Sequence, residues 1–545
     1  MRRTAAATTC GESLIGLLEQ RGVELVFGIP GVHTLELYRG LASSSIRHVT
    51  PRHEQGAAFA ADGYARVSGR PGVCLLITGP GVTNAATAIA SAYHDSQPLL
   101  IVSSATASAD AGRGRGPLHD LPDQQAFMAT ITAFSETVHS PDRLAGAIER
   151  AFAVLEGPRP RPVHIGIPTD VLAMPAGAGT TATAGDPVTK ASGRSATPAL
   201  AGRELRRAAE LLATAREPVI VLGGGAIDAG PAALRVSALT GAPIATSTNG
   251  KGAIPETHPA ALGATLTLQP VYGALERADV VLAAGTEFSE VDYYYEERLP
   301  QFAGSLIRVD VDPAQLDAGR PATIAIQGDC TEALSSLAEL IAAHHHDDRG
   351  ALAAERAHEL RSRLHWWPGA DHMFAVLDAL RAALPTDSIV AADSTQLAYV
   401  ANAYLPIEHS RSYLCPAGYG TLGPAVPMAI GAKLAAPDRP VACLVGDGGL
   451  LFTVAELATA AQLALPIAVL VWNNQGYGEI RDSMDRASVP HIGTDTSVDD
   501  LRALARGLGC RGVRAGEIES IAGALSEAFA ADRPTLIELP STLAR

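Results

Sequence analysis

Two short polar motifs carry the strongest chemical signal, and each follows a segment rich in valine, leucine and isoleucine. Gly446-Asp447-Gly448 follows Val441–Val445, and Asn473-Asn474 follows Pro466–Trp472, with 24 residues between the motifs. Neighbouring parallel strands end at the same edge of a sheet, and ligands bind at such edges. An Asp carboxylate, an Asn carbonyl and a loop carbonyl form the all-oxygen set that Mg²⁺ takes while it bridges phosphates. The pair predicts a magnesium and diphosphate site, whereas Gly-Asp-Gly alone would be an ordinary turn.

Small residues around Asp447 fit this prediction. Gly446, Gly448 and Gly449 leave the backbone open to a phosphate. A helix expected at Val454–Leu463 would point its positive end toward the same place.

A second candidate for chemistry is Glu54, in the segment RHEQGAAFAADGYAR at 52–66. The alanines and phenylalanine after it predict a helix that packs on an apolar surface, with Glu54 at its start. Burial disfavours the charged form of a carboxyl, so this acid is expected to stay protonated near neutral pH and to exchange a proton with a bound group. The simpler interpretation is an acid favoured by the helix dipole.

Together these motifs resemble the thiamine-diphosphate enzyme family of acetolactate synthases and of pyruvate and benzoylformate decarboxylases, over nearly the whole chain. The resemblance implies that Asp447, the Asn474 side chain and the main-chain carbonyl of Gly476 bind Mg²⁺. It also implies that Glu54 drives the aminopyrimidine of thiamine diphosphate into the form that takes the proton from C2. The expected cofactors are thiamine diphosphate and Mg²⁺.

Further positions follow from the same resemblance. In the segment GYGTLG at 418–423, the Gly420 carbonyl would accept a hydrogen bond from the aminopyrimidine and Leu422 would bend the cofactor. The remaining implied cofactor contacts are Gly28, Pro30 and Gly31 on the pyrimidine side, and Gly446, Gly448, Gly449 and Tyr477 on the diphosphate side. In this family the glutamate and the metal site of one active site come from different subunits, so a homodimer or homotetramer is expected.

Three segments look unlike acetolactate synthases and are similar to decarboxylases of 5-guanidino-2-oxopentanoate (2-ketoarginine): 112–124, 393–396 and 474–481. This resemblance implies non-oxidative decarboxylation of a 2-oxo acid to 4-guanidinobutanal and CO₂. A guanidinium binds best to a carboxylate in a fixed orientation. Glu479, five residues after Asn474, is the candidate for binding this group. The alternative, that Glu479 pairs with Arg481 or Arg52 and never contacts the substrate, is equally open.

Other polar residues are weaker candidates. His119 could transfer a proton or hold the substrate carboxylate, although a histidine on a Gly-rich loop is as often a surface residue. Asp120 and Asp393 are further acids expected on loops that face the pocket.

Two alternative functions stay open. One is a carboligase like acetolactate synthase, and the other is a flavin-linked 2-oxo acid oxidase. Gly223-Gly224-Gly225 follows the apolar segment Pro218–Leu222 but lacks the full GxGxxG spacing. Close packing is the favoured interpretation of these glycines. Some relatives carry FAD in this domain, so FAD is left open and not favoured.

Short apolar segments alternate with Ala-rich helical segments along the whole chain, which is typical of parallel sheets covered by helices. The sequence predicts an α/β protein of three doubly wound parallel-sheet domains: a pyrimidine-binding domain at 1–177, a linker at 178–197, a middle domain at 198–345, a linker at 346–368 and a diphosphate- and Mg²⁺-binding domain at 369–545. The expected strands are Val23–Phe27, Gly72–Thr78, Pro98–Ser103, Pro162–Ile167, Pro218–Leu222, Ala278–Ala284, Leu306–Val311, Ser388–Ala392, Val441–Val445, Pro466–Trp472 and Pro534–Leu539.

The composition excludes several classes of protein. With 545 residues and a net charge of −15, the chain has no basic surface for nucleic acid. No apolar stretch reaches the length of a membrane span, and the N-terminus does not resemble a signal peptide. The six scattered cysteines contain no CxxC pair. We therefore expect a cytoplasmic enzyme whose partner is a small 2-oxo acid, with neither nucleic acid nor membrane involved.

Overall fold

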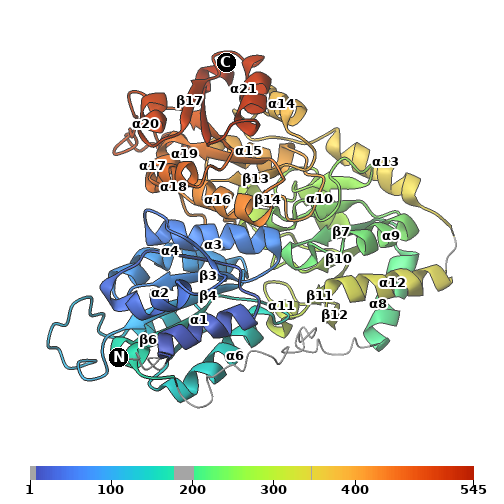
Figure 1. Ribbon diagram of the computed structural model, residues 1–545. Helices are drawn as coiled ribbons and strands as arrows, with labels where there is room; N and C mark the ends of the chain where they lie inside the picture. The colour runs from blue at the N-terminus through green and yellow to red at the C-terminus, as the bar shows by residue number, and fades with distance from the viewer. Residues whose placement is uncertain (1–7, 177–201, 297, 345–346, 545) are drawn as a thin grey trace, which may run out of the picture.

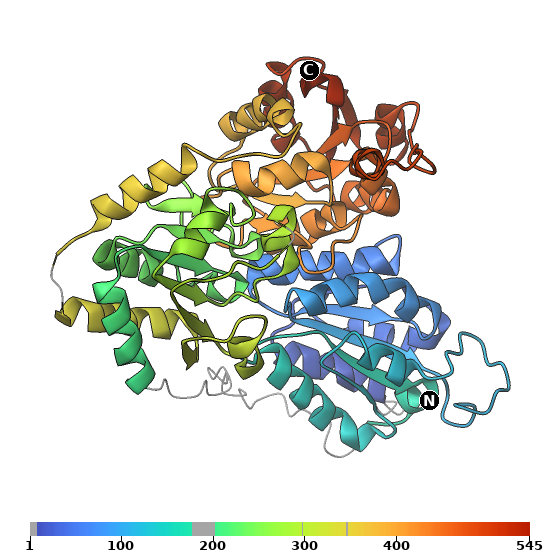
Figure 2. The same cartoon turned by 180° about the vertical axis from the view of Figure 1, so that it is seen from behind.

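The computed structural model describes residues 8–176, 202–296, 298–344 and 347–544, which form three domains, each on a six-stranded parallel sheet. Figures 1 and 2 show the N-terminal domain in blue to teal, the middle domain in green to yellow and the C-terminal domain in orange to red. The predicted fold of three parallel sheets covered by helices is confirmed. The domain boundaries remain predictions, since the linker 178–197 lies outside the described residues and 346–368 contains helix α13 (Gly350–Arg361). None of the helices in the described ranges could cross a membrane.

The first and third sheets have the same arrangement. Their orders are β2-β1-β3-β4-β6-β5 and β14-β13-β15-β16-β18-β17. In each, the chain direction across the sheet reverses beside the first strand, and such a reversal opens a ligand crevice at the strand ends. The strands are β1 Leu25–Gly28, β2 Arg47–Val49, β3 Gly72–Leu76, β4 Leu99–Ala105, β5 Phe134–Thr137 and β6 Val163–Pro168, then β13 Ile389–Ala392, β14 Tyr413–Leu414, β15 Val441–Gly446, β16 Ile467–Asn473, β17 Arg511–Arg514 and β18 Thr535–Pro540.

The middle sheet has the order β12-β11-β10-β7-β8-β9, which is that of dinucleotide-binding folds. Its strands are β7 Pro218–Leu222, β8 Ile244–Thr246, β9 Ala261–Gly263, β10 Val280–Ala284, β11 Ser305–Asp310 and β12 Ile324–Gln327. A Cβ on Gly223 would lie 2.1 Å from the Gly285 carbonyl oxygen, and Gly225 N–H donates to that oxygen at 3.0 Å. The glycines after β7 therefore allow two loops to pack closely.

Helices cover both faces of each sheet. In the N-terminal domain they are α1 Cys10–Gln20, α2 Leu35–Leu41, α3 Glu54–Ser68, α4 Pro80–His94, α5 Gln124–Ala129, α6 Leu144–Leu155 and α7 Thr169–Ala173. In the middle domain they are α8 Gly202–Thr214, α9 Gly230–Thr240, α10 Val271–Arg277, α11 Pro313–Asp317, α12 Cys330–His344 and α13. In the C-terminal domain they are α14 Phe374–Ala383, α15 Gln396–Tyr404, α16 Ala425–Ala435, α17 Asp447–Thr453, α18 Glu456–Gln462, α19 Gly478–Arg486, α20 Leu501–Gly507 and α21 Ser520–Phe529.

The N-terminal and C-terminal domains share one apolar core, formed where α3 packs on α16 (Figure 1). Glycines let the two helices approach closely. A Cβ on Gly63 would lie 2.2 Å from the Met428 carbonyl oxygen, and one on Gly431 would lie 1.9 Å from the Ala60 carbonyl oxygen. This contact fixes the helix that begins with Glu54 against the domain that carries the predicted metal ligands.

Candidate active site

The predicted metal ligands lie together at the carboxyl edge of the third sheet. β15 and β16 run parallel with Gly446 opposite Trp472, so the residues that follow them meet. The Asp447 carboxylate is buried, and its Oδ2 accepts the Gly476 N–H at 2.8 Å. Burial raises the pKa of Asp447, and backbone N–H groups of the turn oppose that shift.

The amide of Asn474 is held in one orientation by a chain of hydrogen bonds. Gln396 Nε2 donates to Asp482 at 2.6 Å, so Gln396 Oε1 is left to accept from Asn474 Nδ2 at 3.0 Å. The Asn474 oxygen then lies 2.7 Å from the Gly476 carbonyl oxygen and 3.1 Å from Asp447 Oδ1. Rotating the amide would let its nitrogen donate to the Gly476 carbonyl and to Asp447 Oδ1, but it would set the Asn474 oxygen 3.0 Å from the Gln396 oxygen.

This cluster of three oxygens fits a hard divalent cation. Oxygens that face one another without a hydrogen between them repel, and a cation among them converts the repulsion into attraction. Mg²⁺ takes oxygen ligands in near-octahedral geometry and commonly keeps positions for phosphate oxygens and water. A carboxylate, an amide oxygen and a backbone carbonyl supply part of that shell and leave the remainder for a diphosphate.

The helix after β15 begins earlier than the sequence pattern predicts. One helix was expected at Val454–Leu463, but α17 starts at Asp447 itself and α18 follows it. A Cβ on Gly448 would lie 2.7 Å from Tyr477 Cε1, and one on Gly449 would lie 3.1 Å from Asp393 Oδ1. The turn therefore requires glycine, because the neighbouring loops fold tightly over it.

Asp393, predicted as an acid that faces the pocket, is instead buried beneath the loop 418–423. Its carboxylate accepts the N–H of Gly423 at 3.0 Å and that of Ser394 at 2.8 Å. Burial raises the pKa of Asp393 to about 7. The prediction failed because the turn after β13 directs this side chain inward, where it holds the loop.

Gly420 and Leu422 lie on that loop. Gly420 has a φ of +62°, in the left-handed region that favours glycine, and it is exposed. Leu422 is half-buried. The loop thus presents a backbone carbonyl and an apolar side chain within two residues of each other.

Glu54 begins α3 as predicted, but its surroundings are more polar than the sequence pattern suggests. The side chain is half-buried, and its Oε2 accepts Asn84 Nδ2 of α4 at 2.9 Å. The N–H groups of Arg52 and His53 donate to Glu456 Oε1 at 2.9 and 3.0 Å. The alanines of α3 pack on α16 while its first residue extends past that contact, so Glu54 is fixed by α4 and by the start of α18.

His119, the histidine singled out from the sequence, lies near Glu54, and His33 lies beside it. The rings of His33 and His119 meet edge to face with centroids 5.1 Å apart, and within the described ranges Nδ1 of each is buried without a hydrogen-bond partner. Burial, with a smaller contribution from His119, lowers the pKa of His33. A Cβ on Gly79 would lie 2.3 Å from the His119 carbonyl oxygen, and one on Gly81 would lie 3.6 Å from Glu54 Oε1. The turn after β3 therefore gathers Glu54 and His119.

The predicted pyrimidine-side loop adjoins the same turn. Gly28 ends β1, and a Cβ there would lie 2.2 Å from the Leu75 carbonyl oxygen. A Cβ on Gly31 would lie 2.5 Å from Ile77 Cδ1, while Pro30 between them is exposed. The two glycines are required by close packing on the end of β3.

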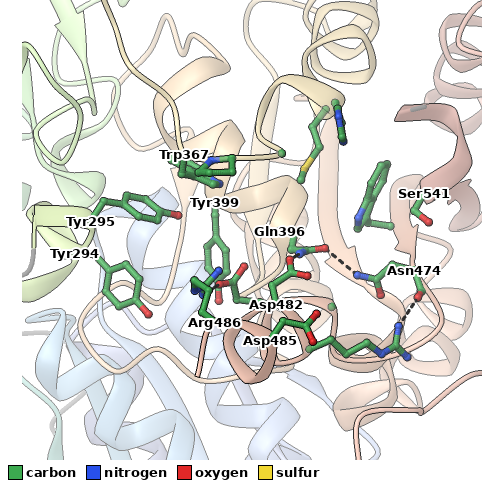
Figure 3. Close-up of a pocket in the computed structure, with 18 of the residues that line it drawn as sticks. Tyr294, Tyr295, Trp367, Gln396, Tyr399, Asn474, Asp482, Asp485, Arg486 and Ser541 are labelled. Carbon is green, nitrogen blue, oxygen red and sulfur yellow. Dashed lines mark hydrogen bonds and ion pairs between the residues drawn. The ribbon is translucent and has the colours of Figure 1, made fainter. Parts of the chain in front are cut away.

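A pocket of about 1140 Å³ opens beside the predicted metal ligands, and Asn474 is part of its wall. It is bounded by α19, by the segment that follows α13 and by a middle-domain loop (Figure 3). Four acids line it: Glu290, Glu479, Asp482 and Asp485. Asp120, which was also expected to face the pocket, is not among these acids. It lies in the N-terminal domain, where its Oδ1 accepts from Thr106 Oγ1 at 2.8 Å.

Aromatic rings line the same pocket. Tyr295 of the middle domain stacks on Trp367, with centroids 4.2 Å apart and planes at 17° (Figure 3). Tyr399 of α15 also lines the pocket, and burial raises its pKa to about 12, so it is uncharged at neutral pH. Arg481 and Arg486 also line the pocket, but the four acids outnumber them. An acidic lining with aromatic faces suits a planar cation such as a guanidinium.

Glu479 pairs with a different arginine from either one considered in the sequence. Its Oε1 accepts a hydrogen bond from Nη2 of Arg486 at 3.0 Å, and Arg486 lies on the same face of α19. Arg481 instead donates to the Asn474 carbonyl at 3.1 Å, and Arg52 donates to Gln462 at 2.6 Å. The Glu479 side chain is still 33% exposed, so one face of the carboxylate stays open to the pocket.

Comparison with known proteins accounts for these features. Models of thiamine pyrophosphate enzymes match all three domains: the N-terminal TPP binding domain at residues 8–127, the central domain at 205–337 and the C-terminal TPP binding domain at 393–539. The chain belongs to the thiamine pyrophosphate enzyme family. The match to two TPP binding domains means that the cofactor of this enzyme is thiamine diphosphate.

Relatives within the family differ in what they are named for. A Pseudomonas aeruginosa protein named "Probable 2-ketoarginine decarboxylase AruI" is 47% identical over 98% of this chain and 95% of its own length. An acetolactate synthase of Mycobacterium bovis is 33% identical over 97% of this chain and 87% of its own length. The large subunit of Escherichia coli acetolactate synthase isozyme 1 is 32% identical over 86% of this chain and 82% of its own length.

Several residues of this thiamine pyrophosphate enzyme's site have no clear signal in the sequence. They are Asn84 on Glu54, Gln396 on Asn474, and the pocket residues Glu290, Tyr295, Trp367, Asp482 and Asp485. Asp482 and Asp485 lie on the helix that carries Glu479, so helical spacing could have suggested them. The others come from distant segments that only the folded chain brings together.

Proposed function

We propose that this enzyme decarboxylates 5-guanidino-2-oxopentanoate without oxidation, to 4-guanidinobutanal and CO₂. The observation that supports it most is the pocket beside Asn474, which is lined by four acids and by the Tyr295–Trp367 stack. A guanidinium is planar and cationic, and it pairs with carboxylates and stacks on aromatic faces. The 47% identity with a relative named for 2-ketoarginine agrees with this chemistry.

Mg²⁺ and the cofactor diphosphate would be held at the carboxyl edge of the third sheet. We assign Asp447 Oδ1, Asn474 Oδ1 and the Gly476 carbonyl as metal ligands, because their crowding is relieved by a cation. Gly446, Gly448, Gly449 and Tyr477 would border the diphosphate.

Bound thiamine diphosphate supplies the nucleophilic carbon and the electron sink through which CO₂ leaves. Glu54 would hold a proton on the aminopyrimidine side, positioned by its hydrogen bond from Asn84. The Gly420 carbonyl would accept from the amino group, and Leu422 would support the bent cofactor. Gly28, Pro30 and Gly31 would border the pyrimidine.

The substrate would lie between the metal site and α19. Glu479 would bind the guanidinium on the carboxylate face that Arg486 leaves open. One proton must be taken up for each CO₂ released, and His119, whose Nδ1 has no partner in the described part of the chain, is our candidate donor. Since the family builds each active site from two subunits, we propose a homodimer or homotetramer, and a cytoplasmic location.

The experiment is to measure CO₂ release from 2-ketoarginine by the purified protein, with and without thiamine diphosphate and Mg²⁺. The proposal predicts stoichiometric 4-guanidinobutanal and no turnover when either cofactor is removed. Condensation products in place of the aldehyde would favour the acetolactate synthase alternative that the 33% identical relatives suggest. Flavin absorbance in the purified protein together with oxygen consumption would favour the oxidase.

A further inference from the structure

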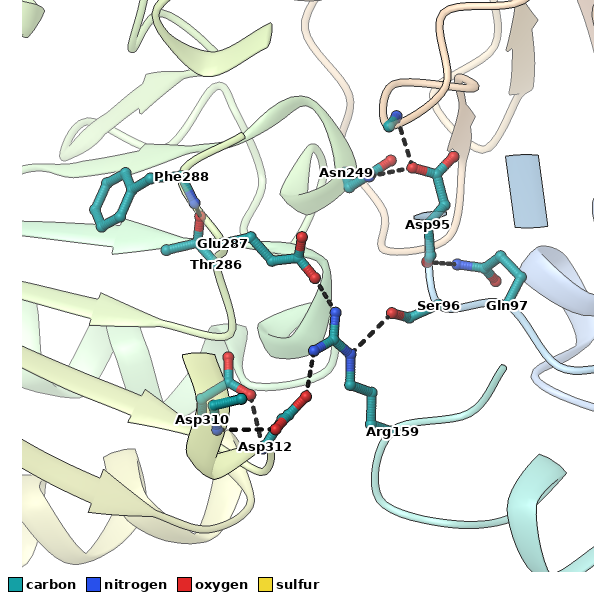
Figure 4. Close-up of polar contacts among 12 residues, drawn as sticks. Asp95, Ser96, Gln97, Arg159, Asn249, Thr286, Glu287, Phe288, Asp310 and Asp312 are labelled. Atoms are coloured by element: carbon teal, nitrogen blue, oxygen red, sulfur yellow. Dashed lines mark hydrogen bonds and ion pairs between the residues drawn. The ribbon is translucent and has the colours of Figure 1, made fainter. Parts of the chain in front are cut away.

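The carboxylate of Asp95 contacts all three domains. Asp95 follows α4, and its side chain is buried. Its Oδ1 accepts the Gly418 N–H at 2.8 Å and Asn249 Nδ2 at 2.9 Å, and its Oδ2 accepts Arg66 Nη2 at 2.7 Å. Figure 4 shows Asp95 and Asn249 facing each other where the N-terminal and middle domains meet.

The position of this carboxylate is fixed by a buried ion pair. Arg66 of α3 also donates its Nε to Asp62 at 2.9 Å, and all three side chains are buried. Moving Asp95 away would leave a buried guanidinium with one partner fewer, which is strongly unfavourable. Asp95 therefore offers the loop that begins at Gly418 a rigid acceptor.

The loop 418–423 has two anchors, one at each end. At its start, Gly418 donates to Asp95 and Tyr419 stacks on His94, with centroids 5.1 Å apart and planes at 22°. At its end, Gly423 donates to Asp393 at 3.0 Å. Gly420 lies between the anchors, where its own N–H donates to the Pro416 carbonyl at 3.0 Å and Ser394 Oγ donates to the Thr421 carbonyl at 3.1 Å. The place of the Gly420 carbonyl depends on these contacts together with the two anchors.

We propose that Asp95 is a positioning residue for the cofactor: by holding Gly418 it sets the place of the Gly420 carbonyl, and hence the binding of the aminopyrimidine. The proposal rests on the role given to Gly420 above. If Asp95 only joined the domains, its loss would lower stability and leave the affinity of the folded protein for thiamine diphosphate unchanged.

Three variants separate these roles. Gly418→Ala places a Cβ 2.8 Å from Asp95 Oδ1 and 3.0 Å from His94 Cβ, so it displaces the loop and leaves the ion pair intact. Asp95→Asn removes the negative charge and so weakens both the hydrogen bond from Gly418 and the ion pair with Arg66. Asn249→Ala is the matched control, because it removes a donor from the same oxygen without touching the loop.

Cofactor-free protein is titrated with thiamine diphosphate at saturating Mg²⁺, and each melting midpoint is recorded. We expect Gly418→Ala and Asp95→Asn to raise the Kd by about tenfold or more, since the hydrogen bond from Gly418 to a charged carboxylate is broken in the first variant and weakened in the second. Asn249→Ala should stay within about twofold of wild type, since the Gly418 contact remains.

If Gly418→Ala and Asp95→Asn both bind thiamine diphosphate with wild-type affinity, the proposal is overturned. It is also overturned if Asn249→Ala weakens cofactor binding as much as they do. If Gly418→Ala does not fold, the comparison of Asp95→Asn with Asn249→Ala decides. Because the readout is cofactor binding, a wild-type protein that binds thiamine diphosphate but leaves 2-ketoarginine intact would refute the proposed function alone.

Discussion

Replacing Glu479 with glutamine tests how the substrate side chain is recognised. The change keeps the size of the side chain and removes its charge. The informative pair of substrates is 2-ketoarginine and its ureido analogue, which has nearly the same shape and no charge. If Glu479 binds the guanidinium, the variant should lose activity with the first substrate and keep it with the second.

The expected size of the effect follows from the exposure of the site. A charge-assisted hydrogen bond contributes about 1.5–3 kcal/mol when buried, and an exposed ion pair about 0–1 kcal/mol. Glu479 is 33% exposed and already paired with Arg486, which places the contact between these limits. We expect kcat/KM for 2-ketoarginine to fall about 5- to 30-fold, equivalent to about 1–2 kcal/mol, and that for the analogue to change less than about twofold.

Steady-state kinetics of both substrates give the ratio directly. Glu359→Gln is the control, because this acid of α13 pairs with Arg363 and does not line the pocket. A fall of the same size for both substrates would refute the reasoning, since it would mean that Glu479 supports the metal loop or the fold and does not recognise charge.

Three further changes have defined outcomes. Glu54→Gln should lower kcat by about 10²- to 10⁴-fold with little change in melting midpoint, and full activity in this variant would contradict its assignment. Asn474→Ala should raise the Mg²⁺ concentration needed for half-maximal activity by about tenfold or more. Asn473→Ala should have a smaller effect, because the Asn473 side chain donates to Glu538. Equal effects of the two changes would argue against Asn474 as a metal ligand. His164 is buried between Ser103 and Ser135, and burial lowers its pKa to about 3. Between pH 6.5 and 3 the unfolded chain therefore binds one more proton at this histidine than the folded chain does, so the free energy of unfolding falls as the pH is lowered. His164→Gln should remove up to about 1.4 kcal/mol per pH unit of this fall. If the denaturant midpoints of wild type and variant change with pH in the same way across this range, the reasoning is refuted.

The interior of each sheet could be predicted from the sequence, and the edges could not. The eleven expected strands are all present within a few residues of their predicted bounds. The strands that the pattern missed are β2, β5, β8, β9, β12, β14 and β17. Six of these seven are sheet edges, and β8 lies next to one. An interior strand is buried on both faces and appears as an apolar run, whereas an edge strand such as Arg511–Arg514 is short, polar and partly exposed.

The proximity of Asp447 and Asn474 could be predicted, because each belongs to a short motif at the end of a strand. Asp447 and Asn474 follow apolar strands, and the parallel pairing of β15 with β16 brings them together. The environment of Glu54 was not predictable, since Asn84 and Glu456 reach it from separate elements. Asp393 shows the same limit: its sequence position suggested a pocket acid, but the direction of the turn after β13 placed it beneath a loop.

The most direct measurement is a competition among 2-oxo acids. The protein, with thiamine diphosphate and Mg²⁺, is incubated with equimolar 2-ketoarginine, pyruvate, 2-oxoisovalerate and benzoylformate, and the products are identified by mass spectrometry. The proposed function predicts that 4-guanidinobutanal dominates. Acetolactate or another ligation product as the main species would contradict it, and would leave the cofactor site in place with a different substrate.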